Sequence, residues 1–218
     1  MYKKVIVITI CLCGLLSLSY VFYTQIKAVA AQLLLEKAWE KHLIVNNNEV
    51  GIEQQNYNTS HDIKPWPWAD IRVVARLTFI SQQKESIVLD NDSGQALAFG
   101  PGLSGATPLG GDYPLVISGH NDSHFSLLKD IEIGDEIIIQ SNIKQSSILR
   151  VTSVKVIDTR VDNLHLNKLI NRKHSTVKTG INPVHNSVTQ GLVLLTCYPF
   201  DTLSQNTPYR YLVEATEI

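Results

Sequence analysis

The sequence predicts an all-β protein, a closed barrel of eight strands with short helices, preceded by an N-terminal transmembrane helix. Two observations carry this prediction. Eight short runs of apolar or alternating residues follow one another with turn residues between them, as in a barrel of short strands. An uncharged stretch near the N-terminus is long enough to cross a bilayer as a helix.

The uncharged stretch runs from Val5 to Tyr23, and nineteen helical residues span about 28 Å, close to the thickness of the hydrocarbon core. Lys3 and Lys4 precede it, and Lys27 is the only basic residue close behind it. This bias places the N-terminus in the cytoplasm and the remainder outside. The alternative is a cleaved signal peptide, since small residues at 28–30 resemble a cleavage site, but the apolar run is longer than a signal core.

The rest of the chain divides into a connecting region and one domain. Apolar residues recur at helical spacing from Ala28 to Leu43, which predicts an amphipathic helix that packs on the domain. The polar, aperiodic stretch at 46–61 predicts a linker. The predicted organisation is therefore a cytoplasmic tip and anchor over 1–27, a helix and linker over 28–64, and one folded domain over 65–218.

Within that domain, Ile71 to Phe79 alternates between apolar and other residues, the period of a half-buried strand. Trp66 and Trp68 precede this strand and are expected to close the core. Turns are expected at Gly134-Asp135 and at 110–112, and a short helical turn from Phe125 to Leu128. The other predicted strands are Ile87 to Leu89, Ala96 to Phe99, Leu115 to Ser118, Glu136 to Gln140, Ile148 to Asp158, Leu192 to Cys197 and Arg210 to Thr216.

Composition excludes several classes of protein. The chain has nineteen Lys and Arg and twenty Asp and Glu side chains, so its net charge is close to zero and does not indicate nucleic-acid binding. No glycine-rich phosphate loop is present. Cys197 is the only cysteine outside the apolar N-terminus, so the exported part cannot form an internal disulfide. A lone exported thiol invites a functional explanation.

Three chemically distinct residues stand at strand ends: His120 closely follows a predicted strand, Cys197 closes one, and Arg210 opens one. Singly, each also fits a structural role, as a core cysteine, a surface histidine or a solvated arginine. Together they supply a nucleophile, a proton carrier and a fixed cation. A free thiol is only about 3% ionised at pH 7, so His120 is suited to exchange a proton with Cys197. Arg210 keeps its proton and can donate hydrogen bonds to an oxyanion.

Two further residues are candidates for support. Thr196 and backbone amides near Cys197 are expected to complete the oxyanion environment, and Asp122 can either orient His120 or form a turn. His120 and His124 lie four apart, but Gly119 and the preceding strand argue against a metal pair on one helix face. No metal site and no cofactor are expected.

The residues around this triad resemble the sortases. Leu194-Leu-Thr-Cys197 matches most of the family's Thr-Leu-x-Thr-Cys motif, with Val193 in place of its first threonine. Ser118-Gly-His120 and Arg210-Tyr-Leu-Val213 match the family's histidine and arginine segments in the same order. The resemblance narrows to the Gram-negative, class GN sortases of proteobacteria through four segments: Trp66 to Asp70, Ala96 to Gly102, Gly119 to Phe125 and Thr196 to Asp201.

The resemblance implies a membrane-anchored cysteine transpeptidase of the hydrolase class, built around an eight-stranded barrel. Cys197 would attack the threonine carbonyl of an LPXTG-like C-terminal sorting signal on an exported protein, form a thioacyl enzyme, and transfer the acyl chain to an amine. It also implies attachment to the inner membrane with the domain in the periplasm. Two alternatives remain: a hydrolytic cysteine peptidase, and a non-catalytic membrane-tethered barrel that binds an exported partner.

The segment from Asp162 to Gln190 is irregular and carries four basic residues against one acidic residue. In sortases the connection before the cysteine strand forms a wall of the groove for the sorting signal. This segment is therefore expected either to select the signal or to be a tolerated surface insertion, which chain entropy permits.

Overall fold

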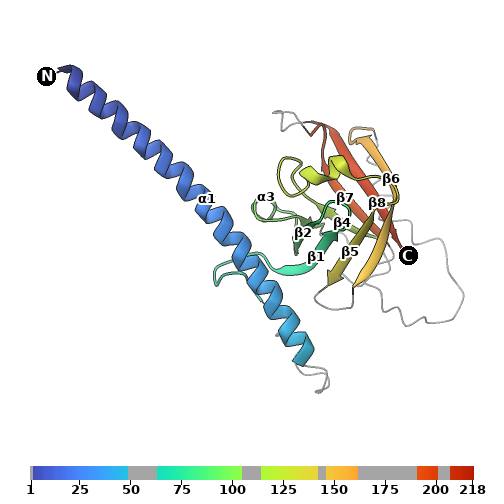
Figure 1. The fold of residues 1–218 in the computed structure, drawn as a ribbon. Helices are drawn as coiled ribbons and strands as arrows, with labels where there is room; N and C mark the ends of the chain where they lie inside the picture. Colours follow the sequence, from blue (N-terminus) through green and yellow to red (C-terminus); the bar gives the residue numbers. More distant parts are fainter. Residues whose placement is uncertain (1, 49–62, 105–113, 142–145, 162–190, 201–206) are drawn as a thin grey trace, which may run out of the picture.

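The computed structural model describes residues 2–48, 63–104, 114–141, 146–161, 191–200 and 207–218. Most of the predicted linker, the turn at 110–112 and the basic segment at 162–190 lie outside these ranges. The N-terminal part of the chain is a single helix, α1 (Tyr2–Asn48), which continues without interruption through the predicted amphipathic helix. It is long and apolar enough to cross a membrane. Figure 1 shows its N-terminal half projecting away from the strands.

Within the described ranges, eight strands close into a barrel in the order β1-β2-β3-β4-β7-β8-β6-β5. Most neighbours are antiparallel, but β2 with β3 and β4 with β7 are parallel pairs. The strands are β1 (Val73–Phe79), β2 (Lys84–Leu89), β3 (Gly102–Leu103), β4 (Leu115–Ser118), β5 (Glu136–Ser141), β6 (Ser147–Asp158), β7 (Gly191–Cys197) and β8 (Tyr209–Glu217). The predicted all-β barrel with an N-terminal apolar helix is thus confirmed.

The barrel interior is filled by every second side chain, as the pleat of a strand requires. In β1 the residues Ala75, Leu77 and Phe79 are buried in this interior and alternate with half-buried neighbours. Ile137 and Ile139 of β5 continue the same core. The helical turn expected near Phe125 is a 3-10 helix, η1 (Ser126–Asp130), whose Leu128 closes one end of the core.

One predicted strand is wrong. Residues around Ala96 form a short helix, α3 (Gly94–Leu97), and the third strand is instead the two-residue β3. The Ser93 side chain accepts a hydrogen bond from the Ala96 amide, which caps the helix, and the Phe99 amide donates to the Ala96 carbonyl. These local hydrogen bonds favour a helix here, whereas the apolar character of the run predicted a strand.

The C-terminal part of α1 packs on the outside of the barrel. Leu35, Ala38 and Trp39 are buried against β1, β2 and α3 in a second apolar core. Arg76 of β1 lies 5.7 Å from the Trp39 ring centroid, and its Nη2 lies 2.6 Å from Glu36 Oε2. Helix α1 is therefore packed into the folded domain through its C-terminal part, and its N-terminal part is an apolar extension.

The two tryptophans before β1 behave differently. Trp66 packs edge-to-face on Phe99 at a centroid distance of 5.2 Å and joins the second core, as expected. The expectation is wrong for Trp68, whose side chain is 81% exposed. The Ala69 amide donates to the Trp66 carbonyl oxygen at 3.0 Å, so the chain turns here and only the Trp66 ring packs on the core.

A third apolar cluster covers the outer face of the sheet formed by β4, β7, β8 and β6. Its buried members are Val116, Val193, Leu212 and Ile157, and Leu195 packs against them. Strand β7 therefore has apolar neighbours on both faces, because its alternate residues Leu192 and Leu194 belong to the barrel interior. This double burial matches the nearly continuous apolar sequence of the strand.

Replacing Trp39 with Ala is expected to lower the free energy of unfolding by about 3 kcal/mol, because it leaves a large cavity between α1 and the barrel. Leu33→Ala is the matched control, since Leu33 lies on the same helix but is 59% exposed. Urea unfolding of the full chain in detergent, followed by circular dichroism, measures both. Equal effects of the two substitutions would show that helix docking does not stabilise the domain.

Candidate functional site

Cys197 is the last residue of β7, which lies between β4 and β8 in the barrel. The preceding side chain, Thr196, is buried, and Leu194 belongs to the barrel interior. Strand alternation therefore turns Cys197 to the outer face, where it is half-buried. The thiol thus stands at the end of the outer apolar cluster and remains accessible.

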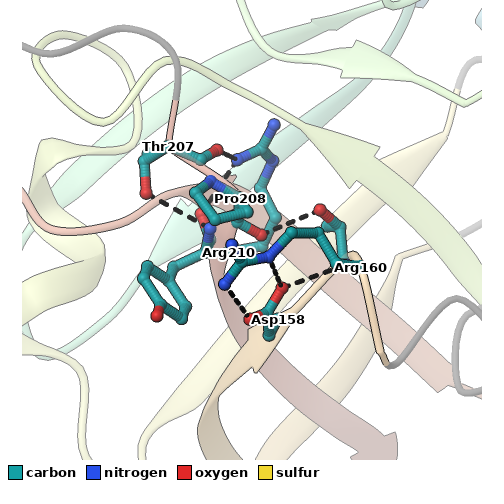
Figure 2. A network of polar contacts seen from close by, with 7 residues as sticks. Asp158, Arg160, Thr207, Pro208 and Arg210 are labelled. Atoms are coloured by element: carbon teal, nitrogen blue, oxygen red, sulfur yellow. Dashed lines mark hydrogen bonds and ion pairs between the residues drawn. The ribbon is translucent and has the colours of Figure 1, made fainter.

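Arg210 is brought directly opposite Cys197. The two residues are register partners in the antiparallel pair β7–β8, and their Cβ atoms are expected about 5 Å apart on the same face. The guanidinium Nη1 donates to the Thr207 carbonyl oxygen at 2.6 Å and to the Tyr209 carbonyl oxygen at 2.9 Å. Figure 2 shows this local folding of the side chain against its own turn.

His120 approaches from the other side of β7. Strand β4 runs parallel to β7 with Ser118 opposite Leu195, and the Gly119 amide donates to the Leu195 carbonyl at 3.1 Å. His120 therefore leaves β4 at the edge of the barrel where β7 ends in Cys197, and its side chain is exposed. The three predicted residues thus gather at one end of adjacent strands, although they come from distant parts of the chain.

Two side-chain hydrogen bonds tie the histidine segment to the cysteine segment. The Thr196 hydroxyl donates to the Gly119 carbonyl oxygen at 2.7 Å, and the Asn121 amide donates to the Pro199 carbonyl oxygen at 2.9 Å. The residues on both sides of His120 are therefore bonded to residues on both sides of Cys197. Thr196 faces the barrel interior, so its hydroxyl holds the histidine segment and does not point to the face that carries the thiol.

The backbone around His120 is also fixed by packing. A Cβ at Gly119 would lie 2.6 Å from Cδ2 of the buried Phe125 ring, so only glycine lets the chain pass this close. The Phe125 amide donates to the His120 carbonyl oxygen at 3.0 Å. These contacts fix the position from which the imidazole projects.

Asp122 and His124 share the turn that follows His120. Asp122 is exposed and, among the hydrogen bonds of the described residues, makes none to His120. Burial lowers the pKa of His124 below its ordinary value of 6.5, the positive charge of His120 lowers it further, and Asp122 opposes both effects. The negative charge of Asp122 therefore acts on His124, the second histidine of the turn.

The hydrogen bond of Asn121 to Pro199 is not predicted from the sequence, where Asn121 is only part of the segment from Gly119 to Phe125. Its position next to His120 was the available signal, but its partner Pro199 is visible only in three dimensions.

Within the part of the chain that the structure describes, no three His, Cys, Asp or Glu side chains form a group that could hold a metal ion.

The comparisons with known proteins identify the family. The family model described as the sortase domain matches residues 80–218, which is more than half of the chain and includes β2 to β8. The chain therefore belongs to the sortase family of cysteine transpeptidases. No curated protein sequence matches it significantly.

Solved structures agree on the fold. Sortase C1 of GBS pilus island 1 is similar with a TM-score of 0.51 at 17% identity, over 86% of this chain and 84% of that one. Sortase A from Corynebacterium diphtheriae is similar with a TM-score of 0.50 at 18% identity, over 86% of this chain and 84% of that one. At this level of identity the likeness concerns the fold alone.

Asn121→Asp is expected to lower kcat/KM for transpeptidation about fivefold, because a carboxylate cannot donate to the Pro199 carbonyl and one hydrogen bond contributes about 1 kcal/mol. Ser123→Ala is the control, since Ser123 is exposed in the same turn. Steady-state kinetics of both variants check this. Unchanged kinetics of Asn121→Asp would show that the bond to Pro199 does not set the histidine position.

The pKa of His124 predicts a pH-dependent contribution to stability. Because the folded pKa lies below the unfolded one, the unfolded chain binds more protons between them, so the contribution is present above about pH 6.5 and is lost as pH falls through the folded pKa. The melting temperature of the wild type should fall between about pH 8 and about pH 5 more than that of His124→Gln. Parallel curves for the two proteins would contradict the assignment.

Proposed function

We propose that this sortase is a class GN enzyme that cleaves an LPXTG-like C-terminal sorting signal and transfers the acyl chain to an amine. The observation that carries the proposal is the convergence of Cys197, His120 and Arg210 at one end of adjacent strands. Thiol, imidazole and guanidinium together supply what acyl transfer needs, namely a nucleophile, a mobile proton and a donor for the oxyanion.

In the first half-reaction the Cys197 thiolate attacks the threonine carbonyl carbon of the signal, and the C–S bond forms as the carbonyl oxygen gains negative charge. The Arg210 guanidinium donates hydrogen bonds to this oxyanion. As the carbonyl re-forms, the peptide C–N bond breaks and protonated His120 gives its proton to the departing amine. A thioacyl enzyme, a released C-terminal fragment and a neutral His120 remain.

In the second half-reaction an acceptor amine attacks the thioester carbonyl, and neutral His120 takes the proton that the amine loses. The C–S bond then breaks and Cys197 leaves as a thiolate beside protonated His120, which restores the starting state. If water replaces the amine, the same intermediate gives a free acid, which is the hydrolytic alternative. The acceptor therefore decides between transfer and hydrolysis.

The proposed location of the reaction rests on the character of α1. Its N-terminal half exposes large apolar side chains from Val5 to Ile26, and the first buried residue of the docked half is Ala31. We propose that the apolar half spans the inner membrane with the N-terminus in the cytoplasm and the barrel in the periplasm. An exported protein whose C-terminal signal is held at the same membrane is the partner that this arrangement serves.

Cys197→Ala is expected to reduce cleavage of a fluorogenic LPXTG-like peptide by about 10³-fold or more and to abolish the thioacyl adduct in mass spectra. The matched control replaces both Cys11 and Cys13 with Ala, since these cysteines are exposed on α1. Addition of a glycine peptide should convert the product of the unsubstituted enzyme from the free acid to the ligated amide.

The outcomes separate the candidate functions. Free acid alone at every amine concentration would identify a hydrolytic peptidase. Full cleavage by Cys197→Ala would exclude Cys197 as the nucleophile. No cleavage and no reaction of Cys197 with a thiol reagent would identify a binding module.

A further inference from the structure

We propose that Thr159, the first residue after β6, is a positioning residue that sets the direction of the Arg210 guanidinium. The inference rests on the proposed function, in which Arg210 stabilises the oxyanion. Thr159 acts through the turn 207–209 that leads into β8, and it does not touch the substrate. The assignment follows from a chain of contacts that joins the end of β6 to the guanidinium (Figure 2).

Arg210 is held by carbonyl groups close to it in the chain. Among the described contacts of the guanidinium, both hydrogen bonds come from Nη1, to the carbonyl oxygens of Thr207 and Tyr209. A guanidinium is planar, so two hydrogen bonds from one of its nitrogens fix the orientation of the whole group. The directions of its other N–H groups are fixed with it. The carbonyls of the turn therefore decide where the remaining donors point.

The turn is itself held by Thr159. Both the amide and the hydroxyl of Thr159 donate to the Pro208 carbonyl oxygen, at 2.9 Å and 2.8 Å. Pro208 has no amide hydrogen, so its carbonyl is its only backbone group that can be anchored. This carbonyl lies between the two carbonyls that bind Arg210, and shifting it would shift both of them.

Thr159 has a charged neighbour, Arg160, that also contacts the turn. Arg160 binds Asp158 through Nε at 3.0 Å and Nη2 at 2.6 Å, and its guanidinium lies 5.8 Å from the Tyr209 ring centroid. The Arg160 side chain is 66% exposed, so water and salt weaken this pair. Thr159 is half-buried and uncharged, and its hydrogen bonds do not depend on ionic strength in this way. Thr159 is therefore the stronger determinant of the turn.

The turn also touches the nucleophile side of the site. The Tyr209 carbonyl that accepts from Arg210 also accepts from the Tyr198 amide at 3.1 Å, directly after Cys197. A displaced turn would thus move the guanidinium relative to the thiol. In enzyme sites a misplacement of about 1 Å can cost about 10²-fold in rate, so loss of one anchoring bond is expected to be visible in kinetics.

The test compares Thr159→Val with Thr152→Val in the full chain in detergent. Thr152 also lies on β6, and its hydroxyl donates to the Glu214 carbonyl of β8 at 3.2 Å, far from Arg210 along the strand pair. Thr159→Val should lower kcat for peptide cleavage about tenfold with little change in KM, and Thr159→Ser should restore it. Thr152→Val should leave kcat within about twofold.

A double-substitution cycle separates positioning from general destabilisation. In an Arg210→Lys background the planar group is gone, so Thr159→Val should cause little further loss, and labelling of Cys197 by a small thiol reagent should be unchanged throughout. The inference is overturned if Thr159→Val behaves like Thr152→Val, or if its loss is undiminished in the Arg210→Lys background. Absence of any Cys197-dependent cleavage by the unsubstituted protein would instead overturn the proposed function, and this inference with it.

Discussion

The site depends on the hydrogen bonding of β7 along both of its edges. Strand β4 is parallel to it on one side and β8 is antiparallel on the other. Because parallel strands end at the same edge, His120 leaves β4 where Cys197 ends β7, and because β8 runs the other way, Arg210 enters at the same level. Three residues that are distant in the sequence therefore meet without a dedicated loop to bring them together.

The packing around β7 makes this arrangement rigid. Leu192 and Leu194 face the barrel interior, while Val193 lies in the outer cluster, so any shift of the strand by one residue would exchange its two apolar faces. The Thr196 hydroxyl adds a buried hydrogen bond to the carbonyl of Gly119, the residue directly after β4. His120 projects beyond this packed region and is exposed, and Cys197 and Arg210 are half-buried at its end.

The sequence was most informative where periodicity is strong. The alternation from Ile71 to Phe79 and the apolar run ending in Cys197 both predict the strands that the structure contains. The prediction failed at Ala96 to Phe99, because one serine cap decides the conformation of a short run, and β3 is too short to show any period. The candidate triad was recognisable because each member stands beside a strand. Thr159 and Asn121 were not, since their partners Pro208 and Pro199 offer only backbone carbonyls, which leave no mark in the sequence.

The continuity of α1 gives the barrel a defined relation to the apolar N-terminal half of this helix. From the end of the uncharged stretch at Tyr23 to the first docked residue, Ala31, eight helical residues rise about 12 Å. A flexible linker of the same length would let the domain rotate freely, whereas a helix whose Trp39 is fully buried against β1 and β2 fixes its orientation. Under the proposed topology, the cysteine end of the barrel is then held in one orientation to the membrane that carries its substrate. In that proposed arrangement the enzyme would meet a membrane-held sorting signal by diffusion in two dimensions, and the docking of α1 would serve recognition as well as stability.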